Sequence, residues 1–592
     1  MSLIVQKFGG TSVADAEKIR AAARRALRAQ QQGNQVVMVV SAMGKNTDIL
    51  VDLAGQVCED PSPREMDMLL STGEQVSVAL VAMAIHDLGG KAVSLTGGQI
   101  GVRTDSSHTR ARIQSIDTSR MRTLLDEGNI VIAAGFQGVD QDLNITTLGR
   151  GGSDTSAVAL AAVLGAEMCE IYTDVDGVFT TDPRLVASAR KMSHVSHDEM
   201  LELASLGAGV MHSRSIEFGK KFHVPIHVRN SGVFTDAPGT VIGPIAESED
   251  RPVSGCALTK EEARITIEGV PDEPGASLSI FRRLADLNIT VDMILQTPGS
   301  EGKASISFTV IQGDLSRALA AARDASSELG AGPISHDDTV CKVSVVGLGM
   351  ATQAGVADRM FRALAESDIN IQAITTSEIK VSCLVKREQG LEALRAVHAE
   401  FELDRPPAKV APFEASQEVA QAADLAAVVS GLQAMEDLTV QGCELDESQA
   451  LITMANVPDQ PGISADIFEG VAAESIIVDM IVQGVGGDGK TTLSFTVPAK
   501  DADRARKVVE AIADRLGGDV TSLASVAILS VNGVGIRSHT GVSTRMFRAL
   551  SAAGINVELI STSEVRVNVV VAREQGDAGL AALAAAFEDV VK

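Results

Sequence analysis

Over the first 245 residues, short apolar runs alternate with longer stretches whose apolar residues recur at helical spacing. The apolar runs predict strands at residues 4–8, 35–41, 91–96, 129–134, 168–173 and 225–229. The longer stretches predict helices that include residues 14–30, 65–88 and 153–164. This alternation is typical of an α/β sheet with helices on both faces, and we expect one such domain over residues 1–245.

The rest of the chain contains a long internal repeat. RITIEGVPDEPG at 264–275 recurs as LITMANVPDQPG at 451–462, so Pro271 matches Pro458 at an offset of 458 − 271 = 187. A second motif, RMFRAL, begins at Arg359 and again at Arg545, an offset of 545 − 359 = 186. Each repeated block contains two units of strand, amphipathic helix and paired strands, which predicts four small α+β modules. We place them at residues 254–339, 340–404, 441–525 and 526–592.

Two segments predict breaks between these units. Residues 242–253 are polar and contain two prolines, which marks the main domain boundary. Residues 405–440 begin with Pro406 and Pro407 and continue into an alanine-rich stretch, which predicts a stiff break and a linker helix. We therefore expect one large domain followed by two pairs of small modules.

Composition and charge exclude several classes of protein. The formal charge of −26 repels phosphate backbones, so we expect no nucleic-acid partner. No uninterrupted apolar stretch approaches the roughly 20 residues of a membrane helix, and the N-terminus lacks a secretory pattern. We expect a cytoplasmic protein without a membrane partner. The six cysteines lie far apart in the sequence, which predicts reduced thiols, and we assign no metal ligands.

Two glycine-rich loops carry the strongest candidate chemistry. Lys7 precedes Gly9 and Gly10 at the end of a predicted strand, and Arg150 lies in GRGGSDT at 149–155, which opens a predicted helix. Glycines let backbone N–H groups approach phosphates, a helix N-terminus attracts anions, and a guanidinium matches a carboxylate. Each loop alone is also compatible with an ordinary turn or a capped helix. Together they predict a site where phosphates meet a carboxylate, as in phosphoryl transfer.

A third candidate is the acidic turn YTDVDGV at 172–178. It follows a predicted strand, which is the usual position for ligand contacts in α/β sheets. Its spacing does not match a calcium-binding EF-hand loop. A turn rich in aspartate explains the same residues equally well, so the residues alone leave its role open.

These motifs occur in a fixed order through the predicted α/β domain: KFGGTSV at 7–13, VSAMG at 40–44, STGE at 71–74, GRGGSDT at 149–155 and YTDVDGV at 172–178. In this order they resemble the aspartate kinase family, and the repeated C-terminal units resemble ACT domains. The resemblance covers nearly the whole chain. It implies an α/β fold with an N-terminal amino-acid-kinase-like α/β sandwich, followed by four α+β ACT-like (βαββαβ) modules.

The resemblance also implies roles for individual residues. The residues expected to bind ATP are Lys7, Phe8, Gly9, Gly10, Ser41, Ser153, Thr173, Asp174, Phe179 and Arg184. Those expected to bind L-aspartate are Thr47, Glu74, Arg150, Gly151, Gly152 and Ser153. Lys7, Asp174 and Arg150 are expected to be catalytic. One position departs from the family, because Gly209 stands where many members carry a lysine. We expect Arg184 to replace that nucleotide contact.

The implied reaction transfers the γ-phosphoryl group of Mg²⁺-bound ATP to the side-chain carboxylate of L-aspartate. The product, 4-phospho-L-aspartate, starts the synthesis of lysine, threonine and methionine. Two alternatives remain open. The chain could be a related kinase that acts on glutamate or N-acetylglutamate, or a non-catalytic amino-acid sensor that binds nucleotide. Comparing substrates in an ADP-release assay separates these possibilities.

The ACT-like modules imply feedback inhibition by lysine, threonine or both. An amino acid needs an acid or carbonyl for its ammonium group and helix-start amides for its carboxylate, although the VPDxPG motif is also a plain turn. The expected effector residues are Asp272, Gly275, Gln296, Asn370, Ile371, Asp459, Gly462, Gln483, Asn556 and Val557. Because such modules pair through exposed strand edges, we expect a homodimer or a higher homo-oligomer.

Overall fold

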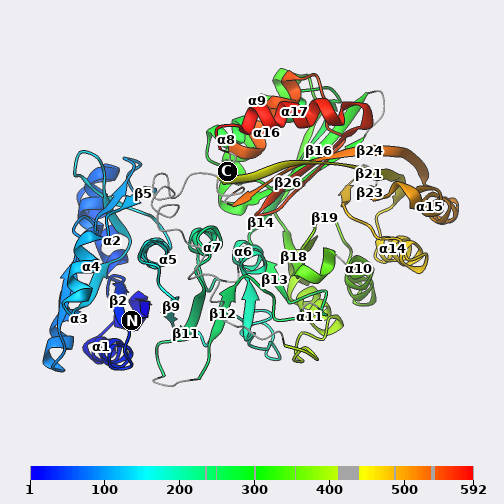
Figure 1. Cartoon of the computed structure of the whole chain (residues 1–592). Coiled ribbons are helices and arrows are strands. Elements are labelled where there is room, and N and C mark those ends of the chain that lie inside the picture. Colours follow the sequence, from blue (N-terminus) through cyan, green and yellow to red (C-terminus); the bar gives the residue numbers. More distant parts are fainter. Residues whose placement is uncertain are drawn as a thin grey trace.

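The computed structural model describes residues 2–590, apart from 208, 234–236, 249, 299–301, 352, 354, 411–438, 486–488, 535 and 537–540. Most of the predicted linker helix at 405–440 therefore lies outside the described residues. In Figure 1 the N-terminal domain lies on the left, in blue to teal, and the repeated modules lie on the right, in green to red. The predicted α/β domain and the α+β modules are both confirmed.

The N-terminal domain is built on an eight-stranded sheet of order β10-β12-β11-β9-β1-β2-β6-β3. Its neighbours pair in parallel except for β11 and β12, which are antiparallel. The strands are β1 (Leu3–Phe8), β2 (Gln35–Val40), β3 (Ala92–Leu95), β6 (Ile130–Ala134), β9 (Met168–Thr173), β10 (His194–Ser196), β11 (Ile226–Asn230) and β12 (Thr240–Gly243). The short strands β10 and β12 lie at one end of the order, and the expected strands do not include them.

The register of the central strands fixes where the site can form. Phe8 lies opposite Val40 on one side and Tyr172 on the other. Since β1, β2 and β9 run parallel, their carboxyl ends meet at one edge, with Gly9, Ser41 and Thr173 at or just after them. Ligands of open α/β sheets bind outside this edge.

A smaller four-stranded sheet adjoins this edge, in the order β5-β4-β7-β8. Its strands are β4 (Val102–Thr104), β5 (Ile113–Ile116), β7 (Gln137–Val139) and β8 (Ile145–Thr147). The strands contain only three or four residues each, so their alternation was too short to be predicted from the sequence. This sheet supplies the segment between β4 and β5 and the strand that leads into the loop carrying Arg150.

Helices cover the large sheet: α1 (Ala16–Gln31), α2 (Asn46–Val57), α3 (Pro63–Asp87), α4 (Ser119–Asp126), α5 (Gly152–Leu164), α6 (His197–Ser205) and α7 (Ser213–Lys221). Small residues let most of α5 lie buried against β1, β2 and β9. By length and composition alone, α3 is also apolar enough to cross a membrane, but its most apolar window is 44% buried inside the protein. It also carries the buried acids Asp67 and Glu74, so we interpret α3 as a helix of the domain core.

The modules contribute most of their strands to one ten-stranded sheet, of order β13-β18-β20-β19-β22-β23-β21-β24-β26-β25. Its strands are β13 (Gly255–Thr259), β18 (Val340–Val346), β19 (Ala373–Ser377), β20 (Lys380–Lys386), β21 (Thr439–Pro458), β22 (Ile481–Val485), β23 (Lys490–Pro498), β24 (Asp519–Val534), β25 (Leu559–Thr562) and β26 (Arg566–Ala572). The first module keeps a four-stranded sheet of its own, made of β14 (Glu262–Pro271), β15 (Asp292–Pro298), β16 (Lys303–Ile311) and β17 (Ile334–Asp337).

The second and fourth modules each take a strand from elsewhere in the chain. The sequence places residues 255–259 in the first module, but β13 pairs with β18 of the second. In the same way, the start of β21 pairs with the part of β24 that belongs to the fourth module. In chain order these two modules are therefore βαββα units, and the borrowed strand completes each one.

The modules also pair across the two halves of the repeat. β19 of the second module pairs antiparallel with β22 of the third, and β15 of the first lies against β25 of the fourth. Two helix layers follow this pairing in Figure 1, one above the sheet and one at its right and lower side. The first layer contains α8 (Ala276–Asp286), α9 (Leu315–Leu329), α16 (Gly541–Ala552) and α17 (Gly576–Phe587). The second contains α10 (Val356–Glu366), α11 (Gly390–Glu400), α14 (Ile463–Ala473) and α15 (Ala502–Leu516).

Helix α6 joins the N-terminal domain to both module pairs. Glu202 on this helix is fully buried, and one of its oxygens lies 2.8 Å from the Lys380 ammonium of the second module. Its other oxygen accepts the Glu564 N–H of the fourth module at 3.0 Å. A single carboxylate therefore contacts one module from each pair.

Candidate active site

A deep cleft opens at the carboxyl edge of the large sheet. Lys7 and Arg150, from the two glycine-rich loops, both line this cleft. Most of the other predicted site residues line it as well: Gly9, Gly10, Ser41, Thr47, Glu74, Gly151, Gly152 and Ser153. The fold thus brings together residues that are more than 140 positions apart in the sequence, in a space open to a ligand.

Lys7 is held at the base of the cleft by an ion pair with Asp154 in the first turn of α5. Only 8% of the lysine is exposed, so its ammonium group has a restricted position. The same helix begins at Gly152, and because Gly152 and Ser153 line the cleft, the positive end of the helix dipole lies at the cleft. A lysine charge and a helix N-terminus therefore act on the same space, which suits phosphate oxygens.

Gly151 shows why the second loop needs glycine. Its φ of +71° lies in the left-handed region, and a Cβ there would overlap the His212 side chain at the start of α7. His212 also lines the cleft, where burial holds the pKa of its imidazole below the ordinary value. Helix α7 thus packs directly against the loop that presents Arg150.

Glu74 lies on α3 with only 3% of its surface exposed. One carboxylate oxygen accepts the Ala42 N–H at 3.1 Å, and the other has no hydrogen-bond partner among the described residues. Burial raises the pKa of Glu74 to about 7. A buried carboxylate with a free oxygen in a cleft is suited to pair with a ligand ammonium group.

Several cations of the cleft were missed by sequence reasoning. They are Arg110, Arg112, Arg214 and Lys221. Arg110 and Arg112 lie between two strands too short to be predicted, and Arg214 follows no recognisable motif. The spacing of these residues carries no signal, because only the tertiary fold directs them to one cleft.

The predicted nucleotide residues near β9 are placed differently. Thr173, Asp174, Phe179 and Arg184 are not among the residues that line the cleft. The end of β9 nevertheless adjoins it, since the Gly9 N–H donates to the Tyr172 carbonyl at 3.3 Å. Arg184 is exposed and forms a bidentate ion pair with Asp182, and its expected contact with the nucleotide stays a prediction.

Two further residues of the expected site have constrained conformations. The Phe8 ring is 1% exposed and stacks on Tyr172 at a centroid distance of 4.8 Å, so only its backbone can approach a nucleotide. Gly209 has a φ of +63°, a conformation that a lysine rarely adopts. The cleft instead receives a lysine from α7, at Lys221.

The predicted effector residues meet in two matching sets. One set lies between the first and fourth modules, which form the first pair, and the other lies between the second and third modules, which form the second pair. In the first pair, Gln296 donates to the Val557 carbonyl at 2.7 Å and Asn556 donates to Asp272 at 2.9 Å. In the second pair, the same contacts are Gln483 to the Ile371 carbonyl at 3.0 Å and Asn370 to Asp459 at 2.9 Å. Gly275 and Gly462 each precede the helix of their set, α8 and α14.

Fold and site together define a class of protein. A parallel sheet, a lysine-bearing glycine loop and a helix N-terminus at its carboxyl edge are the parts of an amino acid kinase, and the amino acid kinase family matches residues 2–230. The ACT domain family matches residues 264–328, 343–401, 453–512 and 529–587. The modules of the C-terminal half are therefore ACT domains, and we call the N-terminal domain the kinase domain.

Sequence relatives identify the family within this class. An aspartate kinase of Stutzerimonas stutzeri is 49% identical over 413 residues, which cover 69% of this chain and 100% of that protein. Aspartokinase 2 of Bacillus subtilis is 51% identical over 411 residues, with the same two coverages. The chain belongs to the aspartate kinase family and is a phosphotransferase that uses a carboxylate as acceptor.

Solved structures agree with this assignment. Aspartate kinase from Synechocystis is 37% identical, covers 99% of this chain and 98% of its own, and gives a TM-score of 0.52. E. coli aspartokinase III in complex with aspartate and ADP is 26% identical, covers 67% and 99%, and gives a TM-score of 0.57. The same enzyme in complex with lysine and aspartate is 25% identical, covers 67% and 99%, and gives a TM-score of 0.54.

Proposed function

We propose that this chain transfers the γ-phosphoryl group of ATP to the side-chain carboxylate of L-aspartate, giving 4-phospho-L-aspartate and ADP. This reaction would begin the synthesis of lysine, threonine and methionine. The observation that carries the proposal is the shared cleft of Lys7 and Arg150, with the buried acid Glu74 on a third segment. Such a cleft offers cations for phosphates and a carboxylate, and an anion for an ammonium group.

In this mechanism no general base is needed. An aspartate side chain has an ordinary pKa of about 3.9, so the nucleophile is already ionised at neutral pH. Catalysis then depends on position and charge. Lys7 and the first amides of α5 would stabilise charge on the transferred group, with Asp174 at the nearby end of β9. Arg150 and Glu74 would hold the α-carboxylate and α-ammonium groups of aspartate.

Mg²⁺ would enter with the nucleotide. Among the described residues, no group of three histidines, cysteines or acids could hold a metal by itself. This fits Mg²⁺, which commonly takes most of its ligands from phosphates and water and only one or two from protein carboxylates. Asp154 beside Lys7 and Asp174 directly after β9 are the carboxylates that would hold the ion, which would neutralise phosphate charge there.

The deciding experiment is an ADP-release assay with Mg-ATP and the full chain. We expect turnover with L-aspartate and much slower turnover with glutamate or N-acetylglutamate. Faster turnover with either of the latter would assign a different substrate to the same fold. If no amino acid stimulates ADP release while ATP still binds, the chain is a sensor and the proposal is wrong.

The raised pKa of Glu74 gives a pH prediction. Below its pKa of about 7 the carboxyl group is protonated and cannot pair with the substrate ammonium group. We therefore expect kcat/KM for aspartate to rise with pH, by up to about tenfold per unit below the pKa, and to level off above it. The measurement is kcat/KM for aspartate across this range. A Glu74→Gln control should be slow at every pH and lack this transition, and a flat wild-type profile would contradict the assigned role.

We propose that the ACT domains bind lysine, threonine or both, and thereby inhibit the kinase domain. The two matching sets of effector residues support two sites, one for each module pair. A coupling of about 1–3 kcal/mol, or roughly 5- to 150-fold in affinity, is typical of such regulation. The two sets are not identical, because Ser551 lies nearest to Gly275 and Ala365 lies nearest to Gly462, so each site can prefer a different amino acid.

Gln296→Ala and Gln483→Ala form a matched pair of variants for this regulation. Each removes the glutamine that bridges two modules in one set. We expect each variant to need about fivefold or more of one amino acid for half-inhibition, with kcat unchanged in the absence of effector. Inhibition curves with lysine and threonine, singly and together, measure this effect. Full sensitivity of both variants to both amino acids would rule out these pockets.

We also propose a homo-oligomer, on different grounds from those expected at first. The edges of β19 and β22 pair within the chain and are not free to pair across a dimer. Instead, the outer faces of α2 and α3 expose large apolar side chains, among them Ile49, Leu53, Val57, Val76 and Met83. Exposed apolar faces of this kind often mark protein contacts. Sedimentation equilibrium of the full chain measures the stoichiometry.

A further inference from the structure

One wall of the active-site cleft consists of two chain segments, residues 109–112 and 147–150. The Ala111 N–H donates to the Thr147 carbonyl at 2.9 Å, which joins them. A Cβ built on Gly149 would lie 3.9 Å from both Cα and Cγ of Arg110, so this arginine packs against the residue before Arg150. Arg110, Arg112 and Arg150 of this wall all line the cleft, and Arg110 lies beside the loop that carries Arg150.

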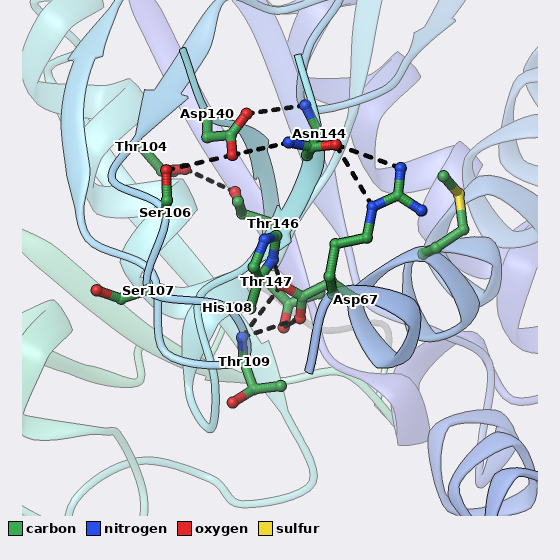
Figure 2. Close-up of polar contacts among 12 residues, drawn as sticks. Asp67, Thr104, Ser106, Ser107, His108, Thr109, Asp140, Asn144, Thr146 and Thr147 are labelled. Atoms are coloured by element: carbon green, nitrogen blue, oxygen red, sulfur yellow. Dashed lines mark hydrogen bonds and ion pairs between the residues drawn. The ribbon is translucent and has the colours of Figure 1, made fainter. Parts of the chain in front are cut away.

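Asp67 binds both segments and does not itself line the cleft. It lies on α3 with no exposed surface, and Figure 2 shows it at the centre of a polar cluster. Its carboxylate accepts the Thr109 N–H at 3.0 Å and the Thr147 hydroxyl at 2.5 Å, and it bonds to His108 Nδ1 at 2.7 Å. A buried carboxylate needs such donors, and each of these belongs to the wall segments or the adjacent residue.

Arg214 fixes the same wall from the opposite side. From α7 its guanidinium donates to the carbonyls of Leu148 and Ala111, one in each segment. Asp67 and Arg214 therefore leave the two segments little freedom to separate. By contrast, no hydrogen bond or ion pair joins the exposed guanidinium of Arg110 or of Arg150 to another described residue. The wall is rigid, and the guanidinium groups of Arg110 and Arg150 are free to take a ligand.

We propose that Arg110 is a further substrate-binding residue, which shares the α-carboxylate of aspartate with Arg150, and that Asp67 is the positioning residue that holds Arg110 in place. This inference rests on the proposed function, because it assigns the anion of the substrate. The chemistry fits, since two guanidinium groups can bind the two oxygens of one carboxylate, each through its own N–H donors.

The test compares Asp67→Asn with Asp140→Asn. Asp140 lies in the turn between β7 and β8 and is also nearly fully buried, at 1% exposure. It accepts the Asn144 N–H at 2.8 Å and the Ser106 hydroxyl at 3.3 Å (Figure 2). Neither of these partners lines the cleft. We expect Asp67→Asn to raise KM for aspartate by about tenfold to a hundredfold, with KM for ATP changed less than about twofold. Asp140→Asn should lower the melting temperature without raising KM for aspartate more than KM for ATP.

Arg110→Ala keeps the test decisive if Asp67→Asn does not fold, because Arg110 is exposed and its loss leaves the core intact. We expect a similar rise in KM for aspartate alone. Thr147→Val, which removes one donor to Asp67 and keeps the shape, should give a smaller rise of the same kind. Where both single variants fold, Asp67→Asn combined with Arg110→Ala should cost little more than either alone, because both act through one guanidinium.

The outcomes separate this inference from the proposed function. If wild-type protein shows no aspartate-dependent ADP release, the proposed function fails. If wild-type protein is active and Arg110→Ala keeps the wild-type KM for aspartate, the function stands and this inference is wrong. Equal rises in KM for both substrates in Asp67→Asn, or fully additive effects in the double variant, would also overturn the positioning role.

Discussion

Replacing Lys7 by alanine is expected to lower kcat for phosphoryl transfer by about two to three orders of magnitude, with a much smaller change in KM for aspartate. The lysine is 8% exposed and held by Asp154 beside the N-terminus of α5. Its charge is therefore oriented before the reaction and needs no rearrangement as charge develops on the transferred group. Interactions that strengthen only in the transition state appear in kcat.

Two further variants make this result specific. Lys18→Ala removes the same charge from an exposed position on α1 and should leave kcat unchanged. Asp154→Asn frees Lys7 without removing it, and we expect a smaller fall in kcat than in Lys7→Ala. Initial rates at saturating ATP and aspartate measure all three. A Lys7→Ala enzyme with kcat near the wild-type value would show that another cation of the cleft performs this role.

The second large effect is expected at the joint between the kinase domain and the ACT domains. Lys380→Met leaves the fully buried Glu202 without its cation, which should cost about 3–5 kcal/mol of stability. Glu202 also accepts the Glu564 N–H, so this one carboxylate contacts the second and fourth modules. Because these modules belong to different pairs, we expect inhibition by both effectors to weaken together while uninhibited kcat is retained.

The control for this prediction is the double variant Glu202→Gln, Lys380→Met. With no buried charge left unpaired, it should recover part of the lost stability but not the inhibition. Denaturant unfolding measures the stability, calorimetry measures effector binding, and initial rates measure inhibition. Effectors that still bind but no longer inhibit would support α6 as the element that couples the domains. Wild-type inhibition in a folded Lys380→Met protein would contradict it.

Much of the kinase domain could be predicted because its signals are local. The strands that contain Lys7 and Tyr172 are short and mostly apolar, and α5 begins at the glycine loop that suggested a helix start. Since parallel strands end at one edge, these local features also predicted where the two glycine loops would meet. The repeat also showed which effector residues are equivalent in its two halves, such as Gln296 and Gln483, but it did not show which modules these residues would join.

Other features had no local signal. The strands beside Arg110 are three or four residues long, below the length at which alternation can be recognised. In the sequence, Asp67 looks like any polar residue of an amphipathic helix. Only its contacts with residues 108, 109 and 147 in the structure indicate that it positions the wall of the cleft. The pairing of β13 with β18 of the second module could not be predicted either, because pairing between strands far apart in the chain produces no pattern in the sequence.

The sequence by itself determined the class of fold, the repeated modules and the residue types of the chemistry, since these depend on periodicity, glycine loops and charge along a continuous chain. Only the tertiary structure decided which modules pair, which strands complete them, and which cations reach the cleft. These outcomes depend on packing between segments far apart in the chain, where apolar burial and the need to satisfy buried charges such as Asp67 and Glu202 select one arrangement.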